Sequence, residues 1–302
     1  MLLRNLIRMI ICFSAVSAQA AGIRQIGVPA DARRPKIDAL MWTPCGMPGQ
    51  DMRLFGITLS GVSECKSSDS KFPVIIISHG ANGNFLNHHD TAGTLADGGF
   101  VVVTLNHPLD SDIDMTRARD ASAFTERPTD IKRLIDYVVQ SSPAVTSVDS
   151  QRIGFFGFSR GGFTGLVLAG AAPDYPDRLR NRPSDEPRIS SFVIVDPLSF
   201  FPSRESLRRV RSSIQLWGSQ FGDQEDVTPE RVSALASTLP TRPEFHVVPN
   251  STHLSFVAPC WQDAAKKAAK ICVDPSGFDR KALHKQFNGQ VLAFFRGILR
   301  GR

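Results

Sequence analysis

Short apolar runs rich in β-branched residues recur along the chain, and amphipathic or turn-rich segments separate them. This alternation is typical of a mostly parallel sheet with helices on both faces, so we predict an α/β fold. Because the runs are apolar almost without interruption, both faces of the predicted strands should be buried. The predicted strands cover residues 72–78, 100–105, 152–158, 190–196, 212–218 and 244–249.

Apolar residues at helical spacing predict a helix before residues 152–158, with one stripe facing the sheet. The stripe comprises Ile131, Leu134, Ile135, Val138 and Val139. Pro128 lies near the expected start of this helix, a place that proline favours. Further helices are expected directly after Ser159, near residues 229–239 and over residues 281–299.

The region from residue 22 to about residue 71 has the pattern of antiparallel strands and turns, so it is expected to extend one edge of the sheet. No repeat, low-complexity tract or linker divides the chain. A length of about 280 residues suits one large α/β domain. We therefore predict a single domain over residues 21–302.

Residues 1–20 combine Arg4 and Arg8 with a short apolar core and end in Ala18-Gln19-Ala20, which is the pattern of a secretory signal peptide. We expect the mature chain to begin near Ala21 and to be periplasmic or secreted. The apolar run is shorter than the ~20 residues that span a bilayer, so no membrane anchor is predicted. The net charge of +6 is mild and dispersed, which argues against a nucleic-acid partner.

The cysteines outside this segment are Cys45, Cys65, Cys260 and Cys272. In an exported chain, an even number of cysteines indicates disulfides, and four cysteines allow three pairings. We favour the pairs that are close in sequence, Cys45 with Cys65 and Cys260 with Cys272, because each would close a loop-rich insertion. The alternatives are buried thiols or a zinc site, and the second is disfavoured because no Cys-x2-Cys pair exists.

The stretch GFSRG places Ser159 between Gly157 and Gly161, directly after a predicted strand and before a predicted helix. Such a corner forces a strained backbone on the serine, and glycines two residues away avoid a collision. The serine hydroxyl would then be exposed at the carboxyl end of the strand, above a helix N-terminus. A glycine-rich turn that only packs is the alternative interpretation.

A nucleophilic serine needs a histidine base, which a carboxylate orients. His253 follows the last predicted strand and precedes the last helix, where it can reach the strand ends, whereas His246 and His284 are interpreted as packing or surface residues. Two aspartates could supply the acid. We prefer Asp196, which ends an apolar strand, and keep Asp223, which follows the next strand, as the alternative.

The tetrahedral intermediate of acyl transfer also needs hydrogen-bond donors for its oxyanion. The glycine-rich turn SHGANG follows residues 72–78, and the amides of Ala81 and Arg160 are the predicted donors. This turn has neither the dinucleotide fingerprint nor the Lys-Ser/Thr of a P-loop, so no nucleotide is expected.

Two other groups of polar residues have features of metal sites. His88 and His89 precede Asp90, but neighbouring residues on a helix diverge, so we interpret them as solvated side chains. Asp110, Asp112 and Asp114 are spaced like the start of a calcium loop, which lacks its glycine and its final glutamate here. They are interpreted as a solvated loop near the site mouth.

These residues together resemble the α/β-hydrolase superfamily, and within it the dienelactone-hydrolase-like group related to platelet-activating-factor acetylhydrolase. The resemblance covers most of the mature chain, and its motifs are ISHGANG, VTLNHP, GFSRGGFTGL, IVDPLSF, THLSFVAPC and CVDPSGFDRKALHKQFN. It implies a serine esterase with Ser159 as nucleophile, His253 as base and amides near Ala81 and Arg160 as oxyanion donors. The acetylhydrolase-like branch places the acid at Asp196, whereas dienelactone hydrolases place it near Asp223 and use a cysteine nucleophile.

We therefore expect an exported serine hydrolase that cleaves small-molecule carboxylic esters through an acyl-enzyme, without metal or cofactor. Lactones, amides or polyesters are alternative substrates, and a non-catalytic binding protein of the same fold is the alternative function. Residues 108–125 and 173–188 should shape the substrate pocket, because they follow a strand end and the nucleophile helix.

Overall fold

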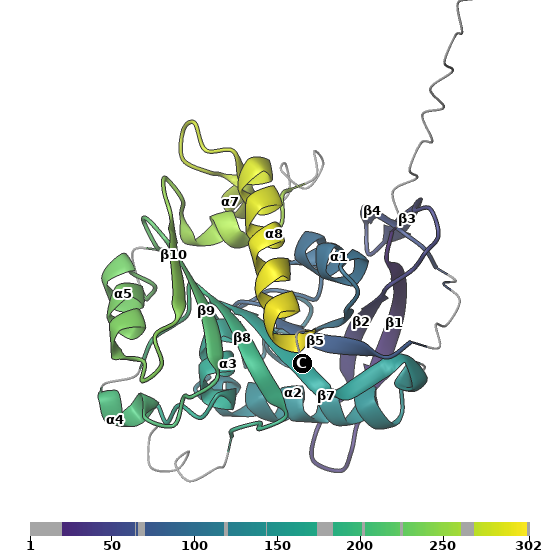
Figure 1. The fold of residues 1–302 in the computed structure, drawn as a ribbon, viewed down its shortest axis with the longest axis horizontal. Coiled ribbons are helices and arrows are strands. Elements are labelled where there is room, and N and C mark those ends of the chain that lie inside the picture. The colour runs from purple at the N-terminus through teal and green to yellow at the C-terminus, as the bar shows by residue number, and fades with distance from the viewer. Residues whose placement is uncertain are drawn as a thin grey trace, which may run out of the picture.

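A single large sheet forms the middle of the molecule in the computed structural model (Figure 1). The structure describes residues 20–63, 65, 70–117, 120–142, 144–173, 184–200, 203–223, 226–260 and 269–300. The sheet has eight strands in the order β1-β2-β6-β5-β7-β8-β9-β10. Their bounds are β1 Gly22–Val28, β2 Ile37–Thr43, β5 Phe72–Ser78, β6 Val101–Leu105, β7 Val148–Phe158, β8 Ile189–Val195, β9 Ser213–Ser219 and β10 Glu244–Val248.

The pairing of the strands confirms the predicted mostly parallel sheet. Every neighbouring pair from β6 to β10 is parallel, whereas β1 pairs with β2, and β2 with β6, in the antiparallel sense. The N-terminal strands thus extend one edge, as expected. A separate hairpin of β3 (Gln50–Leu54) and β4 (Ile57–Gly61) joins that edge through a bridge between Gly22 and Val62.

Alternate residues of the central strands pack into two different apolar clusters, because successive side chains point to opposite faces of a sheet. On β5, Ile76 belongs to one cluster, and Ile75 and Ile77 belong to the other. The first cluster includes residues of α2 (Ser122–Gln140), α3 (Arg160–Leu168) and α5 (Pro229–Thr238). The second includes residues of α1 (His89–Asp97) and α8 (Arg280–Leu299), so helices cover both faces.

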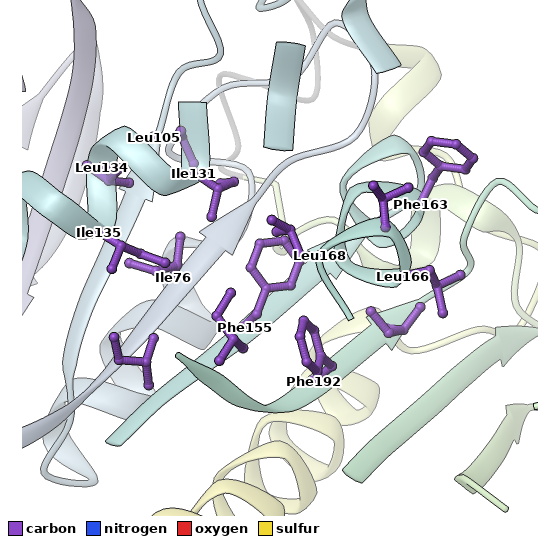
Figure 2. Packing of buried hydrophobic residues seen from close by; sticks show 14 of the residues in the cluster. Ile76, Leu105, Ile131, Leu134, Ile135, Phe155, Phe163, Leu166, Leu168 and Phe192 are labelled. Carbon is purple, nitrogen blue, oxygen red and sulfur yellow. The ribbon is translucent and has the colours of Figure 1, made fainter. Parts of the chain in front are cut away.

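Figure 2 shows part of the first cluster from close by. Strand residues Ile76, Phe155 and Phe192 meet the apolar sides of α2 and α3 there. The stripe predicted on α2 faces this cluster, with Ile131, Leu134, Ile135 and Val138 buried. The remaining short helices are α4 (Arg204–Leu207), α7 (Ala269–Cys272), η1 (Val145–Ser147) and η3 (His253–Phe256).

The helix start predicted at Pro128 is wrong. α2 begins at Ser122, and Pro128 lies inside it. A proline at an interior position removes a helical hydrogen bond and costs about 3 kcal/mol. Tertiary contacts of the helical turn before Pro128 offset this cost. The ring of Phe124 packs against Phe163 and Phe200, and Ala123 is buried.

Both favoured disulfides are present in the structure. Cys45 is bonded to Cys65, and Cys260 is bonded to Cys272 across a loop whose residues 261–268 lie outside the described part. Nearly all of the predicted signal peptide, residues 1–19, also lies outside it. Among the residues that the structure describes, no helix has the length and apolar character needed to cross a bilayer.

Candidate active site

Ser159 occupies a sharp turn between β7 and α3. Its backbone has φ 56° and ψ −117°, which an L-residue rarely adopts, and it is the residue that precedes the first turn of α3. A Cβ at position 157 would lie 2.3 Å from the carbonyl oxygen of Gly161, and a Cβ at position 161 would lie 2.2 Å from that of Ser78. Only glycine fits at these two positions, which explains the GFSRG pattern.

The turn after β5 runs beside this serine. A Cβ on Gly80 would lie 3.2 Å from the Cβ of Ser159, so the two backbones approach closely. Ala81 follows in the same turn, and Arg160 is the first residue of α3. Among the described residues, neither of these two amide N–H groups donates a backbone hydrogen bond. Both are thus available to a ligand at the helix N-terminus.

His253 begins η3 and lies against the strand that carries Ser159. Its ring stacks on Phe158 with 4.5 Å between the ring centroids, and its backbone N–H donates to the Gly222 carbonyl at 2.9 Å. Its Nδ1 lies 3.1 Å from Oδ2 of Asp196. A carboxylate at Nδ1 favours the tautomer that has its proton there, which leaves Nε2 as the basic nitrogen.

Asp196 is held at the end of β8 by several contacts. It is buried, and its φ of 40° turns the chain sharply after the strand. Oδ1 accepts from the Ser219 N–H at 2.7 Å, and Oδ2 accepts from the Ser219 hydroxyl at 2.5 Å. Hydrogen bonds to both oxygens offset the cost of burying a carboxylate and fix its direction toward His253.

Asp223 follows Gly222, whose carbonyl accepts from the His253 N–H. The Asp223 side chain is exposed and accepts from the Val227 N–H at 2.8 Å, which stabilises a local turn. The structure therefore brings Asp196 to the imidazole of His253, whereas the side chain of the alternative, Asp223, is exposed.

Ser159 and His253 are both nearly closed to solvent, with exposed fractions of 7% and 8%. No hydrogen bond between the Ser159 hydroxyl and the His253 ring is present in the described part of the chain. Such bonds are often long in a site without substrate and shorten when one binds. Proton transfer between the Ser159 hydroxyl and the His253 ring would require such a shortened hydrogen bond.

Polar groups near the C-terminal helix hold the His253 segment in place, and the sequence interpretation missed them. Asp274 accepts from the Ser255 hydroxyl at 2.9 Å and pairs with Arg280 of α8 at 2.8 Å. His284 bonds Asp90 at 2.6 Å through Nδ1 and the Ser255 carbonyl at 3.0 Å through Nε2. Asp274, Arg280 and His284 lie within the CVDPSGFDRKALHKQFN motif, which is the signal in the sequence that could have found them.

The interpretation of Asp110 as a solvated residue is wrong. It is buried, and its two carboxylate oxygens bind Arg127 and Arg160, each at 2.7 Å. The side chains of Asp112 and Ile113 are exposed, so only part of this loop is solvated. Of the second predicted pocket segment, 173–188, residues 174–183 lie outside the described part.

The interpretation of His88 as solvated is also wrong. Its side chain is only 1% exposed and packs against the rings of Phe156 and Phe158. Burial lowers the pKa of His88 to about 3, so the ring is neutral at pH 7. Across the described residues, no group of three His, Cys, Asp or Glu side chains could hold a metal ion.

An open, mainly apolar cavity of about 400 Å³ is lined by residues of the segment after the Gly80 turn and of the segment after η3. Phe55, Phe85, Ile113, Val257 and Ile271 form much of its wall. Residues 84–89 continue the turn that contains Gly80, and residues 257 and 258 follow η3 directly. The Ala258 N–H donates to the Asn87 carbonyl at 2.9 Å and joins these two walls.

Known proteins share features with this chain. A model of the dienelactone hydrolase family matches residues 61–178. The structure is similar to the ferulic acid esterase from Streptomyces cinnamoneus, with 16% identity and a TM-score of 0.72, over 95% of this chain and 92% of that one. It is also similar to the dienelactone hydrolase from Anabaena variabilis, with 14% identity and a TM-score of 0.52, over 83% and 94%. No curated protein sequence matches the chain significantly.

The structural likenesses show that the chain has the α/β-hydrolase fold, as the resemblance of its motifs predicted. The matched residues 61–178 include the turn after β5 and the whole of the GFSRG stretch. Together they support a hydrolase related to the dienelactone hydrolase group.

Replacing His88 should reduce the loss of stability in acid. The pKa of His88 is about 3 in the folded chain and near 6.5 when unfolded, so between these values only the unfolded state binds the proton. Stability is then lost as the pH falls below about 6.5, by about 2 kcal/mol at pH 5. In urea unfolding at pH 7 and pH 5, His88→Met should therefore lose about 2 kcal/mol less than the wild type.

Leu86→Met provides the control, because it alters buried packing in the same turn without removing a titrating group. It should keep the wild-type difference between the two pH values. An unchanged difference in His88→Met would show that His88 is protonated equally in both states.

Proposed function

We propose that this protein is a serine hydrolase that cleaves carboxylic esters through an acyl-enzyme. Ser159 is the nucleophile, His253 the general base and Asp196 the acid that orients it. The observation that carries the proposal is the bond of 3.1 Å from His253 Nδ1 to the buried Asp196, at the edge of the sheet where Ser159 occupies its strained turn. The family match to residues 61–178 supports the coarser conclusion, a hydrolase.

The reaction begins when His253 Nε2 takes the proton of the Ser159 hydroxyl as Oγ attacks the ester carbon. The electron pair of the carbonyl moves to its oxygen, and the N–H groups of Ala81 and Arg160 stabilise the resulting oxyanion. The intermediate collapses as the imidazolium protonates the departing alcohol. The same histidine then activates water, which releases the acid and restores the serine.

Asp196 supports both half-reactions by stabilising the imidazolium. Its oxygens already accept from the backbone and the hydroxyl of Ser219, so the carboxylate does not need to move when His253 gains a proton. A fixed negative charge in a buried place interacts strongly with a cation at hydrogen-bond distance. This arrangement explains why a carboxylate is kept in an otherwise apolar strand end.

The cavity lined by the segments that follow the Gly80 turn and η3 suggests which esters fit. Its wall is mainly aromatic and aliphatic, with Phe55, Phe85 and Ile113 among its residues. Apolar surface on a ligand gains about 25 cal/mol for each Å² removed from water. We therefore infer that an aryl or longer alkyl group of the ester binds here.

Export to the periplasm or the medium is part of the proposal. The predicted signal peptide supports it, and both disulfides are compatible with an oxidising compartment.

A fluorophosphonate probe tests the proposed nucleophile. The wild type should be labelled covalently, and Ser159→Ala should not, because the probe reacts with an activated serine. Ser237→Ala, which removes an exposed hydroxyl on α5, should label like the wild type. A folded wild type that stays unlabelled and hydrolyses no p-nitrophenyl ester would favour a binding protein of this fold.

Two matched aspartate variants test the acid. Asp196→Asn should lower kcat on the order of 10⁴-fold, because the amide favours the wrong tautomer of His253. Asp223→Asn should keep nearly full turnover, since the Asp223 side chain is exposed and accepts from the Val227 N–H of a local turn. Steady-state rates of folded variants decide between them, and a large loss in Asp223→Asn alone would reverse the assignment.

A series of p-nitrophenyl esters tests the apolar cavity. Ile113→Asp places a carboxylate in its wall, so kcat/KM for octanoate should fall about tenfold relative to acetate. Val247→Asp changes an exposed apolar residue of β10 and should leave this ratio unchanged. Equal effects of Ile113→Asp on both esters would show that the acyl chain binds elsewhere.

A series of p-nitroanilides, compared with the esters, would rank amides against esters as substrates.

A further inference from the structure

A buried arginine lies beneath the turn that supplies one of the proposed oxyanion donors. Arg127 of α2 is only 1% exposed. Its Nη1 donates to the His79 carbonyl at 2.6 Å, and Nη2 donates to the Gly80 carbonyl at 3.1 Å. Burying a guanidinium is costly unless its donors are satisfied, so these contacts hold the arginine and the turn together. The mechanism proposed above makes no use of this residue.

The contact with Gly80 bears directly on Ala81, because one peptide unit contains both groups. The carbonyl of Gly80 and the N–H of Ala81 lie in the same plane, and no cis peptide bond is present in the described residues. In a trans peptide the two groups point in opposite directions. An Arg127 that fixes the carbonyl on one side thereby aims the N–H of Ala81 to the other side.

Arg127 also strengthens the donor that it aims. A cation at a carbonyl oxygen draws electron density through the amide, which makes its N–H a better donor, as in other chains of hydrogen bonds. Burial lowers the pKa of Arg127 to about 10, so the group remains a cation at neutral pH. The polarising charge is thus permanent over the range in which an esterase works.

Asp110 links this arginine to the second proposed donor. One carboxylate oxygen accepts from Arg127 Nε and the other from Arg160 Nη1, both at 2.7 Å. The guanidinium of Arg160 also lies 5.1 Å from the ring centroid of Phe124. Arg160 supplies the other oxyanion amide from its backbone, so one carboxylate fixes the residues on both sides of the oxyanion site.

The neighbouring polar groups complete a rigid support for the same turn. His107 Nε2 lies 2.9 Å from the Ser78 hydroxyl, and its Nδ1 lies 3.1 Å from Asp130. The His107 N–H also donates to His79 Nε2 at 3.3 Å. Burial lowers the pKa of both histidines well below the usual value, so they are neutral near pH 7 and Arg127 carries the positive charge beneath the turn.

We propose that Arg127 and Asp110 are positioning residues, which aim and polarise the Ala81 amide and fix its distance from the Arg160 amide at the oxyanion site. The inference rests on the proposed serine hydrolase function. A positioning role differs from a purely structural one in its kinetic effect. A donor that acts on the oxyanion contributes in the transition state and not in substrate binding.

Steady-state kinetics on a p-nitrophenyl ester tests the proposal with Arg127→Met, Arg127→Lys and Asp110→Asn. Arg127→Met should lower kcat on the order of 10²-fold, as loss of one oxyanion donor does, with KM nearly unchanged. Arg127→Lys should lose less, because an ammonium can still contact one of the carbonyls. Affinity for a phenylboronic acid, which forms a tetrahedral adduct with serine, should fall in parallel with kcat.

Arg133→Met is the matched control, since Arg133 lies on the same helix and also donates to two backbone carbonyls, those of Pro29 and Pro35. Its activity should equal that of the wild type. Unchanged kcat in folded Arg127→Met, or a loss that appears only in the melting temperature, would overturn the proposal. Should Arg127→Met not fold, Arg127→Lys and Asp110→Asn decide, and unchanged kcat in both overturns it. A wild type without esterase activity would instead contradict the proposed function itself.

Discussion

The turn of the backbone at Ser159 is the constraint on which the rest of the site depends. A left-handed residue between a buried strand and a helix is tolerated only where its neighbours leave room. Here Gly157 and Gly161 leave that room. Ser78 at the end of β5 lies close to Gly161, and Gly80 in the turn after β5 lies close to Ser159. The serine, the helix N-terminus and the glycine-rich turn are therefore fixed relative to one another by backbone atoms.

Side-chain networks then place the remaining groups around that fixed corner. Ser219 binds the carboxylate of Asp196. The segment that contains His253 is held by Asp274 and His284. The turn before Ala81 is held by Arg127 together with Asp110. Each network satisfies buried charges that would otherwise be costly. The loops at this edge of the sheet are thus ordered by polar contacts, whereas apolar packing orders the two faces of the sheet.

Local patterns predicted the strands and the glycine corner well, because hydrophobic runs and glycine spacing act over a few residues. Local sequence also favours Asp196 over Asp223, since a carboxylate at the end of an apolar strand needs a partner. Asp110 and His88 could not be placed in this way. Their burial depends on Arg127 and on Phe158, which are distant in sequence, and only the folded chain reveals such neighbours.

The support of His253 by α8 has a consequence for the order in which the molecule matures. α8 follows every other described element, so Arg280 and His284 leave the ribosome after the strands that carry Ser159 and Asp196. Until they dock, the Ser255 carbonyl lacks its contact with His284, and Asp274, which accepts from the Ser255 hydroxyl, lacks its ion pair with Arg280. A C-terminally shortened chain that ends before α8 thus lacks the contacts of Arg280 with Asp274 and of His284 with Ser255 on this side of η3.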